Sequence, residues 1–199
     1  MLSSLGKNLG NLSRQPRGLQ TFCTSQQKCQ SLGSHLWNLK SGPAPALSLG
    51  AAGLIPFVSA PAYMYQMNEF MPILAESQLA YGAVILSFLG GVRWGKLVTP
   101  GSLIKPSWSQ FTWSVTPSLI AWPALILQYQ QSVTYSLPIS SLTLVVGLGL
   151  CGFLDVKQIG YVSWFKGLRI VLTTVAIMSL LSTLTLWYIL TPSENSNSS

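Results

Sequence analysis

The side chains that could carry out chemistry are few in this chain of 199 residues. The single histidine is His35, and the four carboxylates lie far apart, at Glu69, Glu76, Asp155 and Glu194. An enzyme must gather groups that bind a metal, attack a substrate or exchange protons, and no HExxH, P-loop or glycine-rich phosphate turn occurs here. We therefore expect no catalytic, cofactor-binding or metal-binding residues, and a protein that is not an enzyme.

The three cysteines add no chemistry. They are Cys23, Cys29 and Cys151, which form neither a CxxC pair nor an even set from which disulfides could be built. Cys151 lies within an apolar run, where a reduced and packed thiol is expected.

The composition indicates a membrane protein. Hydrophobic residues make up 49% of the chain and charged residues 8%, and the mean hydropathy is +0.44. Soluble domains carry about a quarter charged residues, so this chain could hardly cover itself with a hydrated surface. The net charge of +7 could suggest nucleic acid, but the basic residues are not gathered on a soluble module and no binding motif accompanies them. We expect no nucleic-acid partner.

Residues 1–45 are expected to form a transit-peptide-like segment and linker without fixed structure. The segment has no acid, and its basic residues are Lys7, Arg14, Arg17, Lys28 and Lys40. One helical face would be apolar, with Leu2, Leu5, Leu9 and Leu12. A basic, serine-rich, amphipathic start is typical of mitochondrial transit peptides. A disordered cytosolic tail is the alternative.

Five apolar stretches predict the fold. A helix needs about twenty residues to cross a bilayer, and the candidates are residues 46–65, 77–92, 108–127, 135–154 and 170–190. The second is short unless Arg93 and Lys96 reach the headgroups and let the helix continue. We therefore predict an all-α fold, a polytopic membrane helical bundle with about five transmembrane helices at 46–190, and a short polar tail at 191–199.

The charges fit an odd number of crossings. With five spans, all eleven Lys and Arg residues fall on the side of the N-terminus, and three of the four acids fall on the other. This is the positive-inside pattern. In the mitochondrial inner membrane it predicts an N-terminus in the matrix and a C-terminus in the intermembrane space. Another intracellular membrane is the alternative.

Small residues predict how two of the helices pack. Every fourth position of the second span is small, at Ala83, Ser87, Gly91 and Gly95. Such a ridge lets two helix backbones approach closely within lipid. The fourth span has small residues of its own, at Gly147, Gly149, Cys151 and Gly152. We expect these two helices to touch within one chain, with contact across a dimer as the alternative.

The basic ends of the helices predict an ion pair and a lipid contact. Asp155 is expected to pair with Arg93 or Arg169, since all three share one membrane level. Six residues should gather at the matrix-side headgroups: Arg93, Trp94, Lys96, Trp164, Lys166 and Arg169. Such basic pockets can bind cardiolipin. Ordinary positive-inside anchoring in the bilayer is the alternative.

Three segments resemble a known family. They are YGAVILSFLGGVRWG at 81–95, LGAAGLIPF at 49–57 and WSVTPSLIAW at 113–122. Together they resemble the transmembrane protein 69 family, and the similarity extends over roughly residues 46–190. The resemblance implies a small multi-pass membrane protein, mitochondrial in animals, and supplies no catalytic residues.

Two functions remain open at this stage. The first is a structural or assembly scaffold that binds other membrane proteins or a second copy of itself, which the small-residue ridge favours. The second is a small carrier or channel, because ionisable groups at membrane depth usually mark pathways. Its candidate residues are Glu76, Arg93 and Asp155, but all three lie near helix ends, where they need no special role.

Overall fold

The computed structural model of the chain describes residues 38–102, 105–129, 136–158 and 160–191. The transit-peptide-like segment up to residue 37 and the tail from 192 lie outside the described residues. A short 3-10 turn, η1 (Asn38–Ser41), comes first. The helices then follow: α3 (Ala44–Ala52), α4 (Ile55–Met67), α5 (Pro72–Val98), α6 (Trp108–Tyr129), α7 (Ser136–Lys157) and α8 (Ser163–Leu190). Because α3 begins at Ala44, residues 38–45, which we expected to lack fixed structure, are ordered against α8 through the bond from Asn38 Nδ2 to Ser163 Oγ. The described residues contain no strand, so the predicted all-α fold is confirmed.

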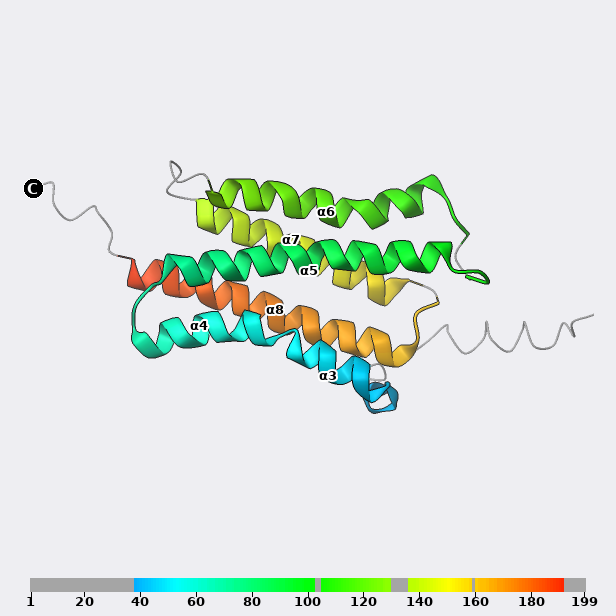
Figure 1. Cartoon of the computed structure of the whole chain (residues 1–199), viewed down its shortest axis with the longest axis horizontal. Coiled ribbons are helices and arrows are strands. Elements are labelled where there is room, and N and C mark those ends of the chain that lie inside the picture. Colours follow the sequence, from blue (N-terminus) through cyan, green and yellow to red (C-terminus); the bar gives the residue numbers. More distant parts are fainter. Residues whose placement is uncertain (1–37, 103–104, 130–135, 159, 192–199) are drawn as a thin grey trace, which may run out of the picture.

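The helices form an up-and-down bundle. Figure 1 shows α6 on one side and the α3–α4 pair on the other, with α5, α7 and α8 between them. Among the described residues, four segments are long and apolar enough to cross a membrane: Ala44–Met67, α5, α7 and α8. The remaining helix, α6, has 22 residues and two internal prolines, and it packs along α5 and α7. Four of the five expected crossings therefore have the length and apolar composition of membrane spans, and a fifth crossing by α6 stays a prediction.

Two helices are longer than the apolar stretches that predicted them. Helix α5 covers 72–98 rather than 77–92, so Arg93 and Lys96 lie within it. Helix α8 begins at Ser163 rather than at 170, and therefore includes Lys166 and Arg169. An apolar stretch in the sequence ends at the first cation, whereas a helix continues as long as its backbone hydrogen bonds do.

The first span, expected as one helix, is broken between α3 and α4. Pro56 has no N–H to donate to the Ala52 carbonyl, so the regular hydrogen-bond ladder stops there. Beside the break, the Tyr81 hydroxyl of α5 donates to the Gly53 carbonyl oxygen at 3.0 Å. A side chain from a neighbouring helix thus satisfies backbone that would be costly to leave unsatisfied in lipid.

At a second proline, Pro61 inside α4, side chains of neighbouring helices again replace the missing backbone donor. Without an N–H at position 61, the Phe57 carbonyl loses its normal helical donor. Gln78 Nε2 of α5 donates to that oxygen at 2.9 Å, and the Ser179 hydroxyl of α8 donates to it as well. The Thr183 hydroxyl completes the group by donating to Gln78 Oε1 at 2.7 Å. This polar cluster links α4, α5 and α8.

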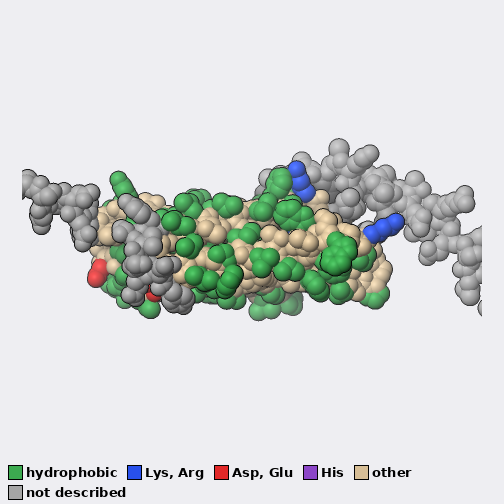
Figure 2. Space-filling view, turned by 90° about the horizontal axis from the view of Figure 1, so that it is seen from above, with side chains coloured by type: hydrophobic (Ala, Val, Ile, Leu, Met, Phe, Trp, Pro, Cys, Tyr) green, Lys and Arg blue, Asp and Glu red, His purple; other side chains and the backbone are tan. Residues whose placement is uncertain are grey.

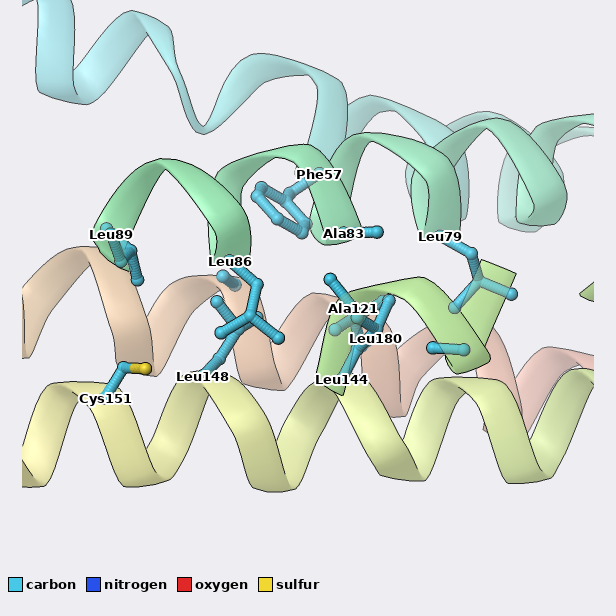
Figure 3. Close-up of a cluster of buried hydrophobic side chains, with 12 residues drawn as sticks. Phe57, Leu79, Ala83, Leu86, Leu89, Ala121, Leu144, Leu148, Cys151 and Leu180 are labelled. Carbon is cyan, nitrogen blue, oxygen red and sulfur yellow. The ribbon is translucent and has the colours of Figure 1, made fainter. Parts of the chain in front are cut away.

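An apolar core fills the space among the helices. The members of this core come from α4 through α8. Figure 3 shows one of them, Phe57 of α4, lying near side chains of α5 and α7. Leu86, Leu144 and Leu180 are at most 1% exposed. Two glycines let α5 and α7 meet here, since a Cβ on Gly147 would lie 2.7 Å from Leu86 Cδ2 and one on Gly82 would lie 3.2 Å from Leu144 Cδ1. The two helices predicted to touch do so within one chain.

The predicted ridge is not the surface that makes this contact. Ala83 is buried, but a Cβ added at Gly91 or Gly95 would meet nothing within 4 Å. Four residues exceed one helical turn, so a stripe at this spacing rotates by about 40° at each step. From Ala83 through Ser87 the stripe therefore passes from the core to the outside of the bundle. The close approach of α5 to another helix here is instead to α6, at Gly90, where a Cβ would lie 2.3 Å from the Ser114 carbonyl oxygen.

Alanine at Gly90 is expected to lower the free energy of unfolding by about 1–3 kcal/mol, the usual cost of overpacking. The reason is that the new Cβ would collide with the backbone of α6, which cannot turn aside as a flexible side chain can. Thermal unfolding of the purified protein in detergent measures the effect. Gly91→Ala is the matched control, because it adds the same atom to the next residue in open space. Equal melting temperatures for the two variants would contradict the packing described.

Candidate functional site

Three charged side chains meet inside one end of the bundle. Arg93 of α5 donates from Nη2 to Asp155 Oδ1 of α7 at 2.7 Å. Arg169 of α8 donates from Nε to Asp155 Oδ2 at 3.0 Å, and its Nη2 lies 2.9 Å from the same oxygen. All three residues are only 5–6% exposed. Asp155 therefore joins both arginines, where the sequence left the choice between them open.

The turn between α7 and α8 positions this trio. Asp155 lies in the last turn of α7, and Arg169 lies in the second turn of α8. Between them Gly160 has a φ of 92°, a conformation that favours glycine and helps the chain reverse direction. Arg93 reaches the same level because α5 continues past its apolar stretch.

The trio has more positive than negative charge. Two guanidinium groups face one carboxylate, and Arg169 Nη2 has no hydrogen-bond partner within the described part of the chain, although it lies within ion-pair distance of Asp155. Lys96 Nζ is also buried without a hydrogen-bond partner there, 3.3 Å from the centre of the Tyr161 ring. A buried cluster with surplus cationic donors is suited to accept an anion.

Tyr161 does not offset this charge. It lies in the turn before α8, is 9% exposed and stacks on Phe165 with ring centroids 4.9 Å apart. Burial, followed by the negative charge of Asp155, raises the pKa of the Tyr161 phenol above its ordinary value of 10.0. The phenol is therefore neutral at physiological pH, and the surplus of positive charge remains.

An apolar cleft of about 380 Å³ reaches the trio from the side of the bundle. It is formed by α3, α4, α5, α7 and α8, and Asp155, Arg169 and Trp164 lie at its polar end. Leu49 and Phe88 on its wall are 73% and 62% exposed. These rim side chains are apolar and face outward. In a membrane the cleft therefore opens toward the lipid chains.

The six residues predicted as a lipid contact lie at one end of the bundle, on α5 and α8, and most of them contact other protein groups. Arg93 is occupied by Asp155, and Trp94 packs edge-on against Phe111 of α6 at 4.8 Å. Lys96 lies over Tyr161, and Lys166 is close enough for the two ammonium groups to repel each other. Only Trp164 and Arg169 line the cleft. The set shares one end of the bundle, as its spacing from the helix ends implied, and its contact with lipid stays a prediction.

Sequence reasoning missed the cleft, Tyr161 and the polar cluster around Gln78. Gln78 did give a signal, because a glutamine within an apolar helix usually bonds to a neighbouring helix. Tyr161 and the cleft gave none, since both depend on how the helices are placed. Among the described residues, no group of three or more His, Cys, Asp or Glu side chains is placed to hold a metal ion.

Apart from the buried Asp155, the described charges also separate along the bundle. Figure 2 shows Lys and Arg side chains at one end and Asp and Glu side chains at the other. The described basic residues belong to the end where α5 and α7 finish and α6 and α8 begin, whereas Glu69 and Glu76 flank the start of α5. The compartment that faces each end stays a prediction.

Comparison with known proteins gives one family. A family model described as a protein of unknown function (DUF3429) matches residues 42–185. Transmembrane protein 69 of Xenopus tropicalis is 46% identical over 147 residues, which cover 73% of this chain and 56% of that protein. Transmembrane protein 69 of Mus musculus is 39% identical over 149 residues, covering 74% and 58%. The matched part thus spans a little over half the length of these relatives. No solved structure matches.

Proposed function

Since the chain belongs to the DUF3429 family, whose relatives here are named transmembrane proteins, we propose that it is a structural or assembly scaffold of the mitochondrial inner membrane. It is a membrane protein with a helical bundle as its body. In the proposed role this body is rigid and offers its outer faces to other membrane proteins or to a second copy of itself.

The observation that carries the proposal is the pair of buried polar links between the helices. At one end Asp155 ties α7 to α5 and α8 through two arginines. In the other half Gln78 and Ser179 tie α5 and α8 to the α4 backbone. A protein that alternates between two open states would have to break such links on each cycle, and unsatisfied polar groups are costly in lipid. Links of this kind suit a bundle that keeps one shape.

The proposed location and orientation come from the charges. The acid-free, basic segment at 1–45 is typical of import into mitochondria, and the described Lys and Arg residues share one end of the bundle. By the positive-inside rule that end faces the matrix. The C-terminus then lies in the intermembrane space.

Proximity labelling tests location, orientation and neighbours together. A biotin-labelling enzyme at the C-terminus is expected to mark intermembrane-space proteins, and one inserted in the connection at 99–107 is expected to mark matrix proteins. Both should enrich the same inner-membrane subunits over free enzymes targeted to each compartment. If both tags labelled one compartment, the five-pass topology would be wrong. If only chaperones were enriched, the scaffold role would be lost.

A carrier is the second candidate, because the cleft lies beside the break between α3 and α4 and ends at two charged residues. Interrupted helices beside a charged site occur in many transporters. The double variant Arg93→Gln/Asp155→Asn removes the ion pair without changing the net charge. Under this function it would abolish uptake of inorganic phosphate or small carboxylates into proteoliposomes that contain the protein. Equal fluxes for variant and wild type would exclude the carrier for these solutes.

A further inference from the structure

We infer that the cleft beside α3 and α4 binds one anionic phospholipid, with an acyl chain in its apolar part and the phosphate group at Arg169. This inference needs only the membrane location and goes beyond the scaffold role. It narrows the expected lipid contact from a general basic surface to one cleft with two chemically different ends.

The apolar part of the cleft suits a hydrocarbon chain. Its volume of about 380 Å³ falls within the roughly 300–1,000 Å³ of ligand-binding pockets. Leu54, Phe57 and Leu172 line its wall, and the exposed rim residues Leu49 and Phe88 leave it open at the side. A chain could therefore slide in from the bilayer without crossing water.

The broken helix creates the space. Gly50 and Gly53 lie on the cleft wall at the end of α3, where they contribute no side chain. A Cβ at Gly50 would already touch Leu168 and Leu172 at 3.4 Å. A larger side chain on this wall would occupy the volume that we assign to the acyl chain.

The polar end selects for negative charge. Arg169 lines the cleft and is 6% exposed; its Nη2 lies 2.9 Å from Asp155 Oδ2 as an ion pair but makes no aligned hydrogen bond among the described residues. A phosphate oxygen would accept the aligned, charge-assisted hydrogen bond that Nη2 does not make to Asp155. It would also offset the surplus positive charge of the Arg93–Asp155–Arg169 trio. A choline group would bring another cation to this surplus, so an anionic headgroup is favoured over a zwitterionic one.

Native mass spectrometry of the full chain in detergent tests the inference. Phosphatidylglycerol and phosphatidylcholine with identical acyl chains are the two probes. We expect wild-type protein to retain one phosphatidylglycerol with about tenfold preference, because both lipids offer the same phosphate to Arg169 but only phosphatidylcholine adds a cation to the positive cluster. Arg169→Gln should abolish the preference while the protein stays folded, because Arg93 and Asp155 remain as a neutral pair. Equal retention of both lipids by wild type would overturn the proposal.

Filling the cleft tests the acyl-chain part separately. Ala46→Trp places a large ring on the cleft wall, whereas Ser48→Trp places the same ring on an exposed position of the same helix outside the cleft. The first should lose the bound lipid and the second should keep it. If Ala46→Trp does not fold, Leu172→Trp serves on the opposite wall. Retention by the filled variants, loss by Ser48→Trp, or displacement of the lipid by inorganic phosphate alone would each overturn the inference.

Discussion

Replacing Asp155 with asparagine is expected to lower the free energy of unfolding by about 3–5 kcal/mol, the cost of removing one partner from a buried ionic group. Asp155 holds two guanidinium groups at 2.7 and 2.9 Å, and all three side chains are 6–7% exposed. Asparagine keeps the shape but removes the only carboxylate from this described cluster. Arg93 and Arg169 would then face each other as buried like charges. Unfolding in mixed detergent micelles measures the loss.

Two controls separate this effect from a general effect of charge. Glu69→Gln removes a carboxylate from an exposed position at the other end of the bundle and should change stability by less than about 0.5 kcal/mol. The triple variant Arg93→Met/Asp155→Leu/Arg169→Met replaces the whole cluster with apolar side chains. It should regain most of the stability lost in Asp155→Asn, since apolar replacements of buried ion pairs are often neutral or better. An Asp155→Asn protein as stable as Glu69→Gln would contradict the described cluster.

The sequence could predict those features that depend on position along a helix. Apolar length predicted all the long helices, four of which qualify as membrane spans, and the alternation of basic and acidic connections predicted which ends lie together. Asp155 and Arg93 each follow an apolar stretch that ends on the same side, so their shared level could be foreseen. The structure adds that Arg169 binds the same carboxylate. Position along the chain was enough here, because short connections leave antiparallel helices little freedom.

Features that depend on rotation about a helix axis could not be predicted in the same way. Gly90 and Gly91 are adjacent and identical, yet one meets the α6 backbone and the other meets open space. The stripe that begins at Ala83 rotates out of the core by Gly95, and no pattern in one sequence fixes where it leaves. The cleft depends on the break at Pro56 and on the placing of α8 beside it. Its lining residues therefore come from five helices and share no motif.

The double variant Gln78→Leu/Ser179→Ala is expected to lower the free energy of unfolding by about 2–3 kcal/mol, since it leaves a buried carbonyl without a donor. Pro61 denies the Phe57 carbonyl its helical partner, and Gln78 Nε2 and Ser179 Oγ supply donors instead. Either single change should cost less, because the other donor remains. Detergent unfolding of the two single variants and the double variant measures these differences.

Restoring the missing backbone N–H provides the decisive comparison. In Pro61→Ala the new N–H lies one helical turn from the Phe57 carbonyl and can bond to it, so that the two side-chain donors are no longer essential. In this background Gln78→Leu/Ser179→Ala should cost about 1 kcal/mol less than with proline present, a coupling typical of groups in one network. Any change in packing caused by Pro61→Ala itself cancels in such a cycle. Equal costs in the two backgrounds would mean that Gln78 and Ser179 stabilise the bundle for a reason other than the carbonyl freed by Pro61.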